Sequence, residues 1–557
     1  MSVWSTVVTK IKEGFRKMIG VNTIENTLRV SPLLSRQMEN SIRLWSAMYS
    51  DKAPWIKEAT QDDPVRVASL GLASLIASEK ARTALLEFES EITAPNAKLD
   101  NEEVVDDSSR YTEPTYDGFG NIIPKAEPDV KKVTDKNTAN LERAKYLNKQ
   151  YEKLKRQLRK QLEYGIAKGG LVIKPYLVAN EVDDKETDWQ IEFDFIQADN
   201  FYPLAFDASG RITEAAFIQT LVEGDTVYRR LEYHKWENNT ATVVNKAFKS
   251  TDLNTSTSRS DLELGQEIPL TDVASWKDLQ AEVIIENIQR PLFAYFKMPE
   301  ANTVDTSSPL GVSGYSRAVS LIKDADMQYS RLLWEYEAGE MAIDIDRDAL
   351  RTSTDNAGNT HTEVPILQQR LFRKVELGND NTYQQFAPTL RDSAYLQGLN
   401  AILMRIEDIV GFGRGTLSDV AQEAKTATEI KILKQRSFQS NADIQSALEG
   451  TLKDTVYIMD AYCELYEITP SGEYDVSFTW DDSIIVDADT ELAKRITLLQ
   501  NGLTSKREVR QWYFGETERQ AREALQEIEK ETTNDMEKEL VMKPYEPKNV
   551  PGMPKDF

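Results

Sequence analysis

The residues most suggestive of nucleotide chemistry are three glycines at alternate positions, Gly411, Gly413 and Gly415. A phosphate-binding loop needs the pattern G-x-x-x-x-G-K-[ST], whose backbone amides and lysine hold the phosphates. The sequence lacks that pattern, and these glycines neither follow a predicted strand nor precede a lysine–hydroxyl pair. The spacing instead predicts a flexible loop, because glycine reaches backbone conformations that other residues avoid.

A second candidate is the acidic run DIDRD at residues 344–348, with Asp355 at the twelfth position. The spacing imitates a calcium loop, D-x-D-x-D-G-x5-E. Ala349 replaces the glycine of that pattern, and Asp355 replaces its bidentate glutamate. Alternation of acids with Ile343 and Ile345 fits a strand edge equally well. We therefore predict no metal site.

Histidine and cysteine are too rare for most catalytic or zinc sites. The chain has only His234, His361 and Cys463. A typical structural zinc site takes four Cys or His ligands, and a serine triad depends on a positioned histidine. One cysteine leaves no internal disulfide and fits a reducing cytoplasm. We predict a protein that is not an enzyme and needs no cofactor.

The net charge is −24, from 67 basic and 91 acidic residues. High-affinity DNA-binding proteins replace phosphate counterions with Lys and Arg, so the composition argues against a repressor or polymerase. It does not argue against a channel, whose wall must let DNA slide. The longest apolar run, Leu70 to Ala77, is too short to span a bilayer.

The first half of the chain predicts an α+β arrangement. Residues 1–20 form an amphipathic pattern that would dock on protein or on a membrane surface, and residues 64–90 look helical. The segment 92–138 is polar and rich in turn residues, which predicts a long loop or hairpin. A helix follows, with an apolar stripe at Leu147, Tyr151, Leu154, Leu158 and Leu162. Period-two patterns then predict strands at 171–178, 190–197, 211–221, 226–236, 282–288 and 292–297.

The second half is dominated by helices. Predicted helices at 314–338 and 391–410 flank an insert, 341–388, with β-like ends and a polar tip. Thr426 and Glu429 form a capping box that starts a helix reaching about Tyr466, roughly 60 Å long. A strand at 474–480 and helices at 488–500, 505–514 and 516–540 complete the prediction, and Ser505 and Glu508 make a second capping box.

Four strings in this order resemble the portal proteins of long-tailed bacteriophages. They are LEYGIAKGGLVIKPYL (162–177), FDFIQADNFYPLAFD (193–207), SPLGVSGYSRAVSLIKDADMQYSRLLWEYE (308–337), and EDIVGFGRGTLSD with KTATEI (within 407–430). No single string is diagnostic. The resemblance rests on their order together with the insert between two helices.

The resemblance implies a portal fold with a wing, a helical stem, a small β-containing clip and an α-helical crown. The implied parts are the wing at 1–308, stem helices at 309–340 and 389–410 around a clip at 341–388, a tunnel loop at 411–425, a long wing helix and strand at 426–485, and a crown with a disordered tail at 486–557.

The implied function is a ring at one capsid vertex, through which double-stranded DNA is packaged, retained and ejected. A dodecameric homo-oligomer is expected. Its implied partners are double-stranded DNA, the terminase large subunit, the scaffold and major capsid proteins, and a head–tail adaptor. The protein would be assembled in the host cytoplasm and reside in the virion. Another structural head or tail subunit, such as an adaptor or minor capsid protein, is the alternative.

The resemblance also indicates where partners would bind. DNA-facing residues of the tunnel loop would be Phe412, Arg414, Thr416 and Lys425, followed by Lys431 and Lys434 at the start of the long helix. Alternatively, these bases pair with local acids such as Asp419, Glu423 and Glu429. Docking at the clip would involve Asp355, Asn356 and Asn359.

Overall fold

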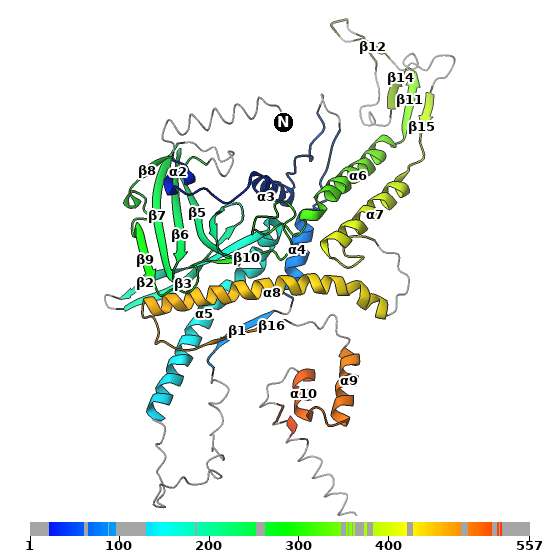
Figure 1. Cartoon of the computed structure of the whole chain (residues 1–557). Helices are drawn as coiled ribbons and strands as arrows, with labels where there is room; N and C mark the ends of the chain where they lie inside the picture. Colours follow the sequence, from blue (N-terminus) through cyan, green and yellow to red (C-terminus); the bar gives the residue numbers. More distant parts are fainter. Residues whose placement is uncertain are drawn as a thin grey trace, which may run out of the picture. The chain divides into compact units, whose positions relative to one another are not determined.

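The computed structural model divides the chain into two compact units, Met1–Trp480 and Asp481–Phe557. The structure describes residues 22–60, 65–86, 88–95, 130–183, 186–251, 262–346, 352–354, 356–358, 360–362, 372–375, 383–419, 427–480, 488–514, 521–522, 524–525 and 528. Both units are mainly regular secondary structure in these ranges (Figure 1).

The first unit combines long helices with antiparallel sheets, which confirms the predicted α+β class. Its helices are α2 (Ile24–Leu28), α3 (Arg36–Tyr49), α4 (Leu72–Ala84), α5 (Val130–Lys168), α6 (Val319–Ala338), α7 (Asp392–Val410) and α8 (Ala427–Leu465). Among the described residues, no helix has the length and hydropathy that crossing a bilayer requires.

Helix α5 is held by the stripe that its sequence predicts. Leu147, Tyr151, Leu154, Leu158 and Leu162 are all buried in the main core. The helix begins at Val130, so the prediction of a loop through residue 138 is wrong over its last nine residues. This first stretch has no apolar stripe to reveal a helix, but extending an existing helix costs far less than starting one.

Strands β2 (Gly170–Asp183), β3 (Glu186–Gln197) and β10 (Ala294–Lys297) form a three-stranded sheet in the order β10-β2-β3. Gly169 joins α5 to this sheet with a positive φ of 92°. A Cβ atom at Gly169 would lie 2.7 Å from the Gly311 carbonyl oxygen. The amide of Met298 also donates to the Gly169 oxygen, at 3.2 Å. These contacts require glycine where α5, β10 and the segment before α6 meet.

A six-stranded antiparallel sheet is formed mainly by the residues that follow β3 in the sequence. Its strands are β4 (Phe201–Phe206), β5 (Ile212–Glu223), β6 (Thr226–Glu237), β7 (Thr240–Ser250), β8 (Gln266–Ile268) and β9 (Glu282–Glu286). Glu223 pairs with Thr226 across Gly224 and Asp225, which confirms the predicted hairpin. Gly224 has a φ of 60°, a conformation that two-residue hairpin turns demand.

Helices α6 and α7 pack against each other, with the insert between them in the sequence. The insert contains β11 (Ala342–Asp346), β12 (Thr352–Thr354), β13 (Thr360–Thr362), β14 (Phe372–Val375) and β15 (Tyr383–Phe386). Asp344 lies on β11 and accepts two hydrogen bonds from Arg373, at 2.7 and 3.1 Å. The acidic run is therefore part of a strand up to Asp346, but β11 is the central strand of the β14-β11-β15 sheet rather than an edge, while Asp355 lies outside the described residues. The described residues contain no group of three or more His, Cys, Asp or Glu placed to hold a metal.

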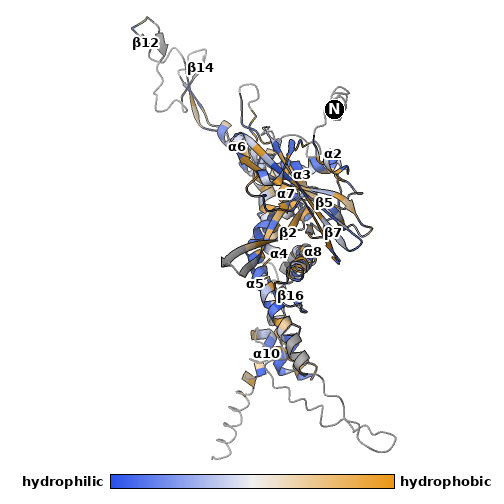
Figure 2. Cartoon of the chain, turned by 90° about the vertical axis from the view of Figure 1, so that its left-hand side faces the viewer, coloured by the Kyte–Doolittle hydropathy of each residue, from blue (hydrophilic) through white to orange (hydrophobic). Residues whose placement is uncertain are grey.

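Helix α8 is a rod of 39 residues. One face is buried from residue 444 to residue 463, at Ile444, Leu448, Leu452, Val456, Met459 and Cys463. In Figure 2, α5 and α8 carry hydrophobic and hydrophilic residues side by side, as expected for helices packed on one face. Strand β16 (Asp475–Thr479) then pairs with β1 (Glu89–Thr93).

The second unit contains α9 (Ala488–Gln500) and α10 (Lys506–Phe514). The predicted capping box at Ser505 and Glu508 is confirmed. The Glu508 amide donates to Ser505 Oγ at 3.2 Å, and the Ser505 amide donates to Glu508 Oε2 at 3.1 Å. The predicted helix at 516–540 and the capping box at Thr426 fall largely outside the described residues.

A buried ionic cluster links the three-stranded β10-β2-β3 sheet to the six-stranded sheet. Glu232 on β6 lies 2.7 Å from the Lys174 ammonium of β2 and 2.9 Å from Arg230. His234 Nε2 lies 2.7 Å from the other Glu232 oxygen, and it donates because an ionised carboxylate only accepts. Burial alone would raise the pKa of Glu232, but Lys174, His234 and Arg230 hold it well below its usual range. Burial lowers the pKa of His234, although Glu232 opposes this.

We predict that the cluster makes the fold less stable in acid. The pKa of His234 is lowered in the folded chain, so the unfolded chain binds more protons as the pH falls through the ordinary histidine value of roughly 6.5. Glu232 has a depressed folded pKa, so its contribution is lost as pH falls further below its unfolded value. The melting temperature should fall steadily on acidification from pH 7.

Glu232→Gln should cost about 3–5 kcal/mol at neutral pH, because it leaves buried cations without their counter-ion. It should also remove the part of the acid decline that lies below the unfolded pKa of glutamate, about 4.3. Glu237→Gln on the same strand is the matched control, since Glu237 pairs with Lys235 while 61% of its side chain is exposed. Equal melting temperatures for both variants at neutral pH would contradict this account.

Candidate functional site around the segment that follows helix α7

Helix α7 ends in a turn that fixes the direction of the next nine residues. Gly411 has a φ of 82°, and its amide donates to the carbonyl oxygen of Glu407. The amide of Phe412 reaches the same oxygen at 2.9 Å. Gly415 also has a positive φ, of 90°. In the described part, residues 411–419, two of the three glycines thus serve defined turns rather than only adding flexibility.

Glu407 anchors this segment from inside. Its side chain is fully buried and accepts hydrogen bonds from the amides of Leu417 and Ser418, at 2.6 and 2.8 Å. It also accepts a bond from the Ser418 hydroxyl at 2.8 Å. Three charge-assisted bonds to one carboxylate make a strong anchor.

Two further side chains hold the segment at its edges. Asn400 on α7 bonds both the amide and the carbonyl of Asp419, each at 2.8 Å. Ser437 on α8 accepts from the Gly413 amide at 2.7 Å. Residues 411–419 are therefore clamped between the end of α7 and the beginning of α8.

The predicted site residues of this segment differ in their accessibility. Arg414 forms an ion pair with Asp408 at 2.5 Å, with 34% of its side chain exposed. Its partner is thus Asp408, while Glu423 and the side chain of Glu429, two of the acids suggested by the sequence, lie outside the described part. The Thr416 hydroxyl is exposed and donates to the Gly413 carbonyl at 2.7 Å. Phe412 packs into the main core and is only 7% exposed, which leaves little of its side chain for a ligand.

The remaining predicted site residues do not belong to the clamped segment 411–419. Lys431 and Lys434 lie in the first turns of α8, where only the backbone is described. Asn356 lies in the exposed turn between β12 and β13. Lys425, Asp355 and Asn359 lie outside the described residues.

Sequence reasoning missed Glu407 and Asn400 as anchors. Glu407 is a lone acid on the apolar stripe of α7, three residues before Val410. A glutamate there signals a buried polar partner, because an ionised side chain on a core face must be satisfied. Asn400 carries no such signal.

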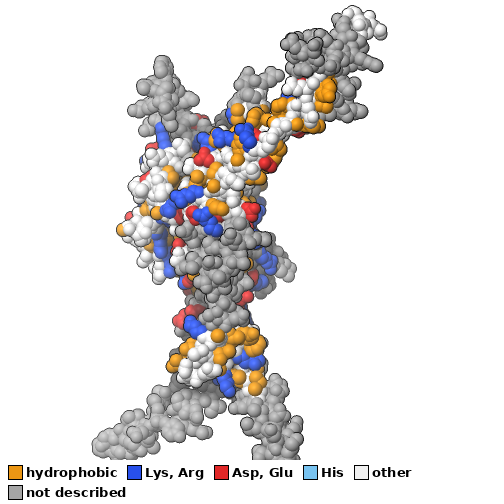
Figure 3. Space-filling view, turned by 90° about the vertical axis from the view of Figure 1, so that its right-hand side faces the viewer, with side chains coloured by type: hydrophobic (Ala, Val, Ile, Leu, Met, Phe, Trp, Pro, Cys, Tyr) orange, Lys and Arg blue, Asp and Glu red, His pale blue; other side chains and the backbone are white. Residues whose placement is uncertain are grey.

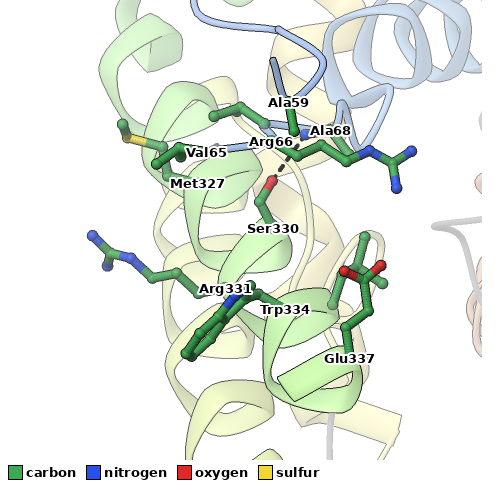
Figure 4. A pocket seen from close by; sticks show the side chains of 11 residues that line it. Ala59, Val65, Arg66, Ala68, Met327, Ser330, Arg331, Trp334 and Glu337 are labelled. Carbon is green, nitrogen blue, oxygen red and sulfur yellow. Dashed lines mark hydrogen bonds between the residues drawn. The ribbon is translucent and has the colours of Figure 1, made fainter. Parts of the chain in front are cut away.

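A second surface feature is a groove on α6. Its volume is about 560 Å³ and its lining is largely apolar, formed by residues 59 and 65–68 with Met327, Ser330, Arg331, Leu333, Trp334 and Glu337 (Figure 4). Trp334 is 60% exposed and Val65 is 56% exposed. The Ala68 amide donates to Ser330 Oγ at 2.9 Å, which fixes one wall of the groove to the helix.

Figure 3 shows hydrophobic side chains gathered along the α6–α7 pair. The exposed members include Met327, Trp334, Tyr336, Leu390 and Leu396. An apolar surface of this kind is typical of a protein-binding site.

We predict that Glu407→Ala releases the clamped segment. Its loss leaves buried amides without an acceptor, at about 1–3 kcal/mol for each group. Hydrogen exchange at Leu417 and Ser418 should become roughly tenfold faster or more. Glu449→Ala is the control, because Glu449 only pairs with Lys453 on the surface of α8. Unchanged exchange at both amides would disprove the anchor.

Comparison with known proteins identifies the family. The family model for the phage portal protein, SPP1 Gp6-like, matches residues 128–538, which is most of the chain and runs from α5 past α10. A search of curated proteins found no significant match. The family excludes the alternative of an adaptor or minor capsid protein. The chain belongs to the SPP1 Gp6-like family of phage portal proteins, which are structural rather than enzymatic and form an oligomeric ring at the capsid vertex through which DNA is packaged and ejected.

Proposed function

We propose that residues 411–425 line the narrowest part of the DNA channel in a dodecameric ring. The observation that carries this proposal is the clamp on residues 411–419, which Glu407 and Asn400 of α7 and Ser437 of α8 hold in place. A segment that meets moving DNA must keep its position under load. Anchors on two helices supply that support.

The charge of the clamped segment suits sliding better than gripping. Arg414 is balanced by Asp408, so the pair presents little net charge to a phosphate backbone. Thr416 adds only a hydroxyl. A single partly neutralised cation adds modest, salt-dependent affinity for DNA. Lys425, Lys431 and Lys434 are proposed to add further weak contacts along the same path.

We propose the following division of the subunit. The wing comprises 1–308 and 426–485, the stem 309–340 and 389–410, the clip 341–388, and the crown 486–557. This follows the order of elements, in which α6 and α7 pair as two legs and carry the small β insert between them. The long wing helix is α8.

We also propose partners for these parts. The terminase large subunit and then the head–tail adaptor would dock on the clip through Asp355, Asn356 and Asn359. Support comes from the exposed polar turn at Asn356, which contributes little to the core. Scaffold and major capsid proteins would contact the remaining outer surface during assembly.

The first test removes the cations of the channel segment. Arg414→Ala and Lys425→Ala should leave ring formation unchanged but alter packaged DNA length or DNA leakage, particularly at low salt. Arg414→Ala makes the segment more negative, so Arg414→Ala combined with Asp408→Ala should restore behaviour toward the wild type. Electron microscopy scores the rings, and gel analysis scores the DNA.

Lys52→Ala is the control, because Lys52 lies on an exposed turn after α3. Packaging and retention that match the control would contradict a DNA-facing role. A defect confined to ring assembly would contradict it as well.

We propose that the α6 groove is covered by a neighbouring copy in the ring. Ile322, Ala325 and Leu332 bury one face of α6 within the subunit. The groove residues Met327, Ser330 and Trp334, spaced three and four residues apart, share another face of the helix. A cyclic ring needs two different complementary surfaces on each subunit, and this groove would be one of them.

The second test separates this contact from folding. Trp334→Ser should leave the melting temperature of the isolated subunit nearly unchanged, because the side chain is already 60% exposed. It should sharply lower the yield of rings. Leu399→Asp should instead impair folding, since Leu399 is only 8% exposed and a buried unpaired charge costs several kcal/mol.

Leu503→Ser is the matched control for exposure, because Leu503 is 74% exposed and lies in the second unit. Size-exclusion chromatography and microscopy measure the ring yield. Normal rings from Trp334→Ser would rule out the groove as a subunit contact.

A further inference from the structure

A polar hollow of about 340 Å³ lies in the first unit, away from the clamped segment in the sequence. Three parts of the chain form it: the turn between β4 and β5, the segment leading into β10, and α8 at Asp454. Its lining residues are Ser209, Gly210, Arg211, Ile212, Arg290, Pro291, Phe293, Tyr295, Lys297 and Asp454.

The lining carries three cations and one acid in a chain whose net charge is −24. Arg290 is already paired with Asp454 at 2.5 Å and also lies over the Tyr457 ring, 5.1 Å from its centroid. The side chains of Arg211 and Lys297 form no ion pair or hydrogen bond within the described part of the chain. Asp207 is close enough to Arg211 for a weak electrostatic effect but does not line the hollow.

The backbones that carry the two available cations are fixed. The Asp207 carboxylate accepts hydrogen bonds from the amides of Ser209 and Arg211, at 2.8 and 3.0 Å. The Asp207 amide donates to the Arg211 carbonyl at 2.9 Å, closing the turn. Lys297 ends strand β10, where it is paired with Gly170 of β2. Arg211 and Lys297, both exposed, therefore extend from backbones that are held in place beside the hollow.

We propose that this hollow binds a phosphate dianion, either free or as the terminal group of a phosphomonoester, through Arg211, Arg290 and Lys297. Three cations and Asp454 give the lining a net charge of +2, and a phosphomonoester carries about −1.5 to −2 at pH 7. A carboxylate or an internal phosphodiester brings only one negative charge. Arginine suits phosphate geometrically because its planar guanidinium donates to two oxygens at once.

The electrostatics of Lys297 agree with an anion at this position. Desolvation by the surrounding side chains lowers the pKa of its ammonium group, and a bound phosphate would reverse that shift. Occupancy would also link the β4–β5 turn to α8, because Arg211 lies on that turn and Arg290 is paired with Asp454 of α8. Phosphate that binds only the folded chain should therefore stabilise the fold increasingly as the phosphate concentration rises above the dissociation constant.

The test is calorimetric titration of the full chain with inorganic phosphate at low ionic strength, alongside melting temperatures at increasing phosphate. We expect saturable binding with a dissociation constant at or below about 1 mM and a melting temperature that rises with phosphate.

Lys297→Met and Arg211→Gln keep most of each side chain but remove its charge. Each should weaken binding roughly tenfold or more. Asp454→Asn removes the competing acid and should tighten binding.

Lys277→Met is the matched control, because Lys277 is exposed and does not line the hollow. A nucleoside monophosphate forms a second arm of the titration. Tighter, Lys297-dependent binding than phosphate identifies a phosphomonoester ligand, whereas equal affinity identifies free phosphate, and both support the site. Absence of saturable phosphate binding overturns the proposal, as does binding that Lys297→Met and Arg211→Gln leave unchanged.

Discussion

The backbones of Gly169 and Gly311 touch where the last turn of α5 meets the segment leading into α6. A Cβ atom at Gly311 would lie only 2.1 Å from the Gly169 carbonyl oxygen. Just beyond, the Gly314 amide donates to the Ile166 carbonyl at 2.9 Å. This crossing sets the position of the α6–α7 pair relative to α5 and the sheet that starts at Gly170. Any side chain at either glycine would force the two chains apart, so the rest of the first unit depends on this contact.

Buried polar contacts connect this crossing to the clamped segment 411–419. Lys80 on α4 is almost fully buried and lies 3.4 Å from Glu300 and 3.3 Å from Ser440 of α8. Burial lowers the pKa of Lys80 and raises that of Glu300, while each partner opposes the shift of the other. Ser440 also lies beneath Gly411, 3.3 Å from where a Cβ atom would stand. The end of α7 thus rests on a helix that is itself fixed by buried polar contacts.

Periodicity predicted the elements that bury one continuous face. The stripes of α5 and α8 and the hairpin of β5 and β6 came directly from residue spacing, because burial of a single face leaves its period in the sequence. The predicted start of α5 was too late, because residues 130–138 carry no such stripe. The anchors Glu407 and Asn400, the exposure of Trp334 and the cations of the hollow depend on which surfaces meet in three dimensions. Local spacing does not encode those contacts. Glycine spacing predicted a loop after α7, but only the family resemblance gave that loop a role.

The pairing of β1 with β16 joins residues at opposite ends of the first unit. Ser477 donates a hydrogen bond to the Glu91 carbonyl, 386 residues earlier. Arg143 similarly reaches the Pro470 carbonyl at 3.0 Å and Glu464 at 2.9 Å. A ribosome adding about 5–20 residues per second needs roughly 20 to 80 seconds to supply the later partners. Until then the nascent chain exposes the strand edge of β1. Completion of the subunit is therefore tied to the end of translation, and premature pairing of unfinished chains is the hazard that this connectivity creates.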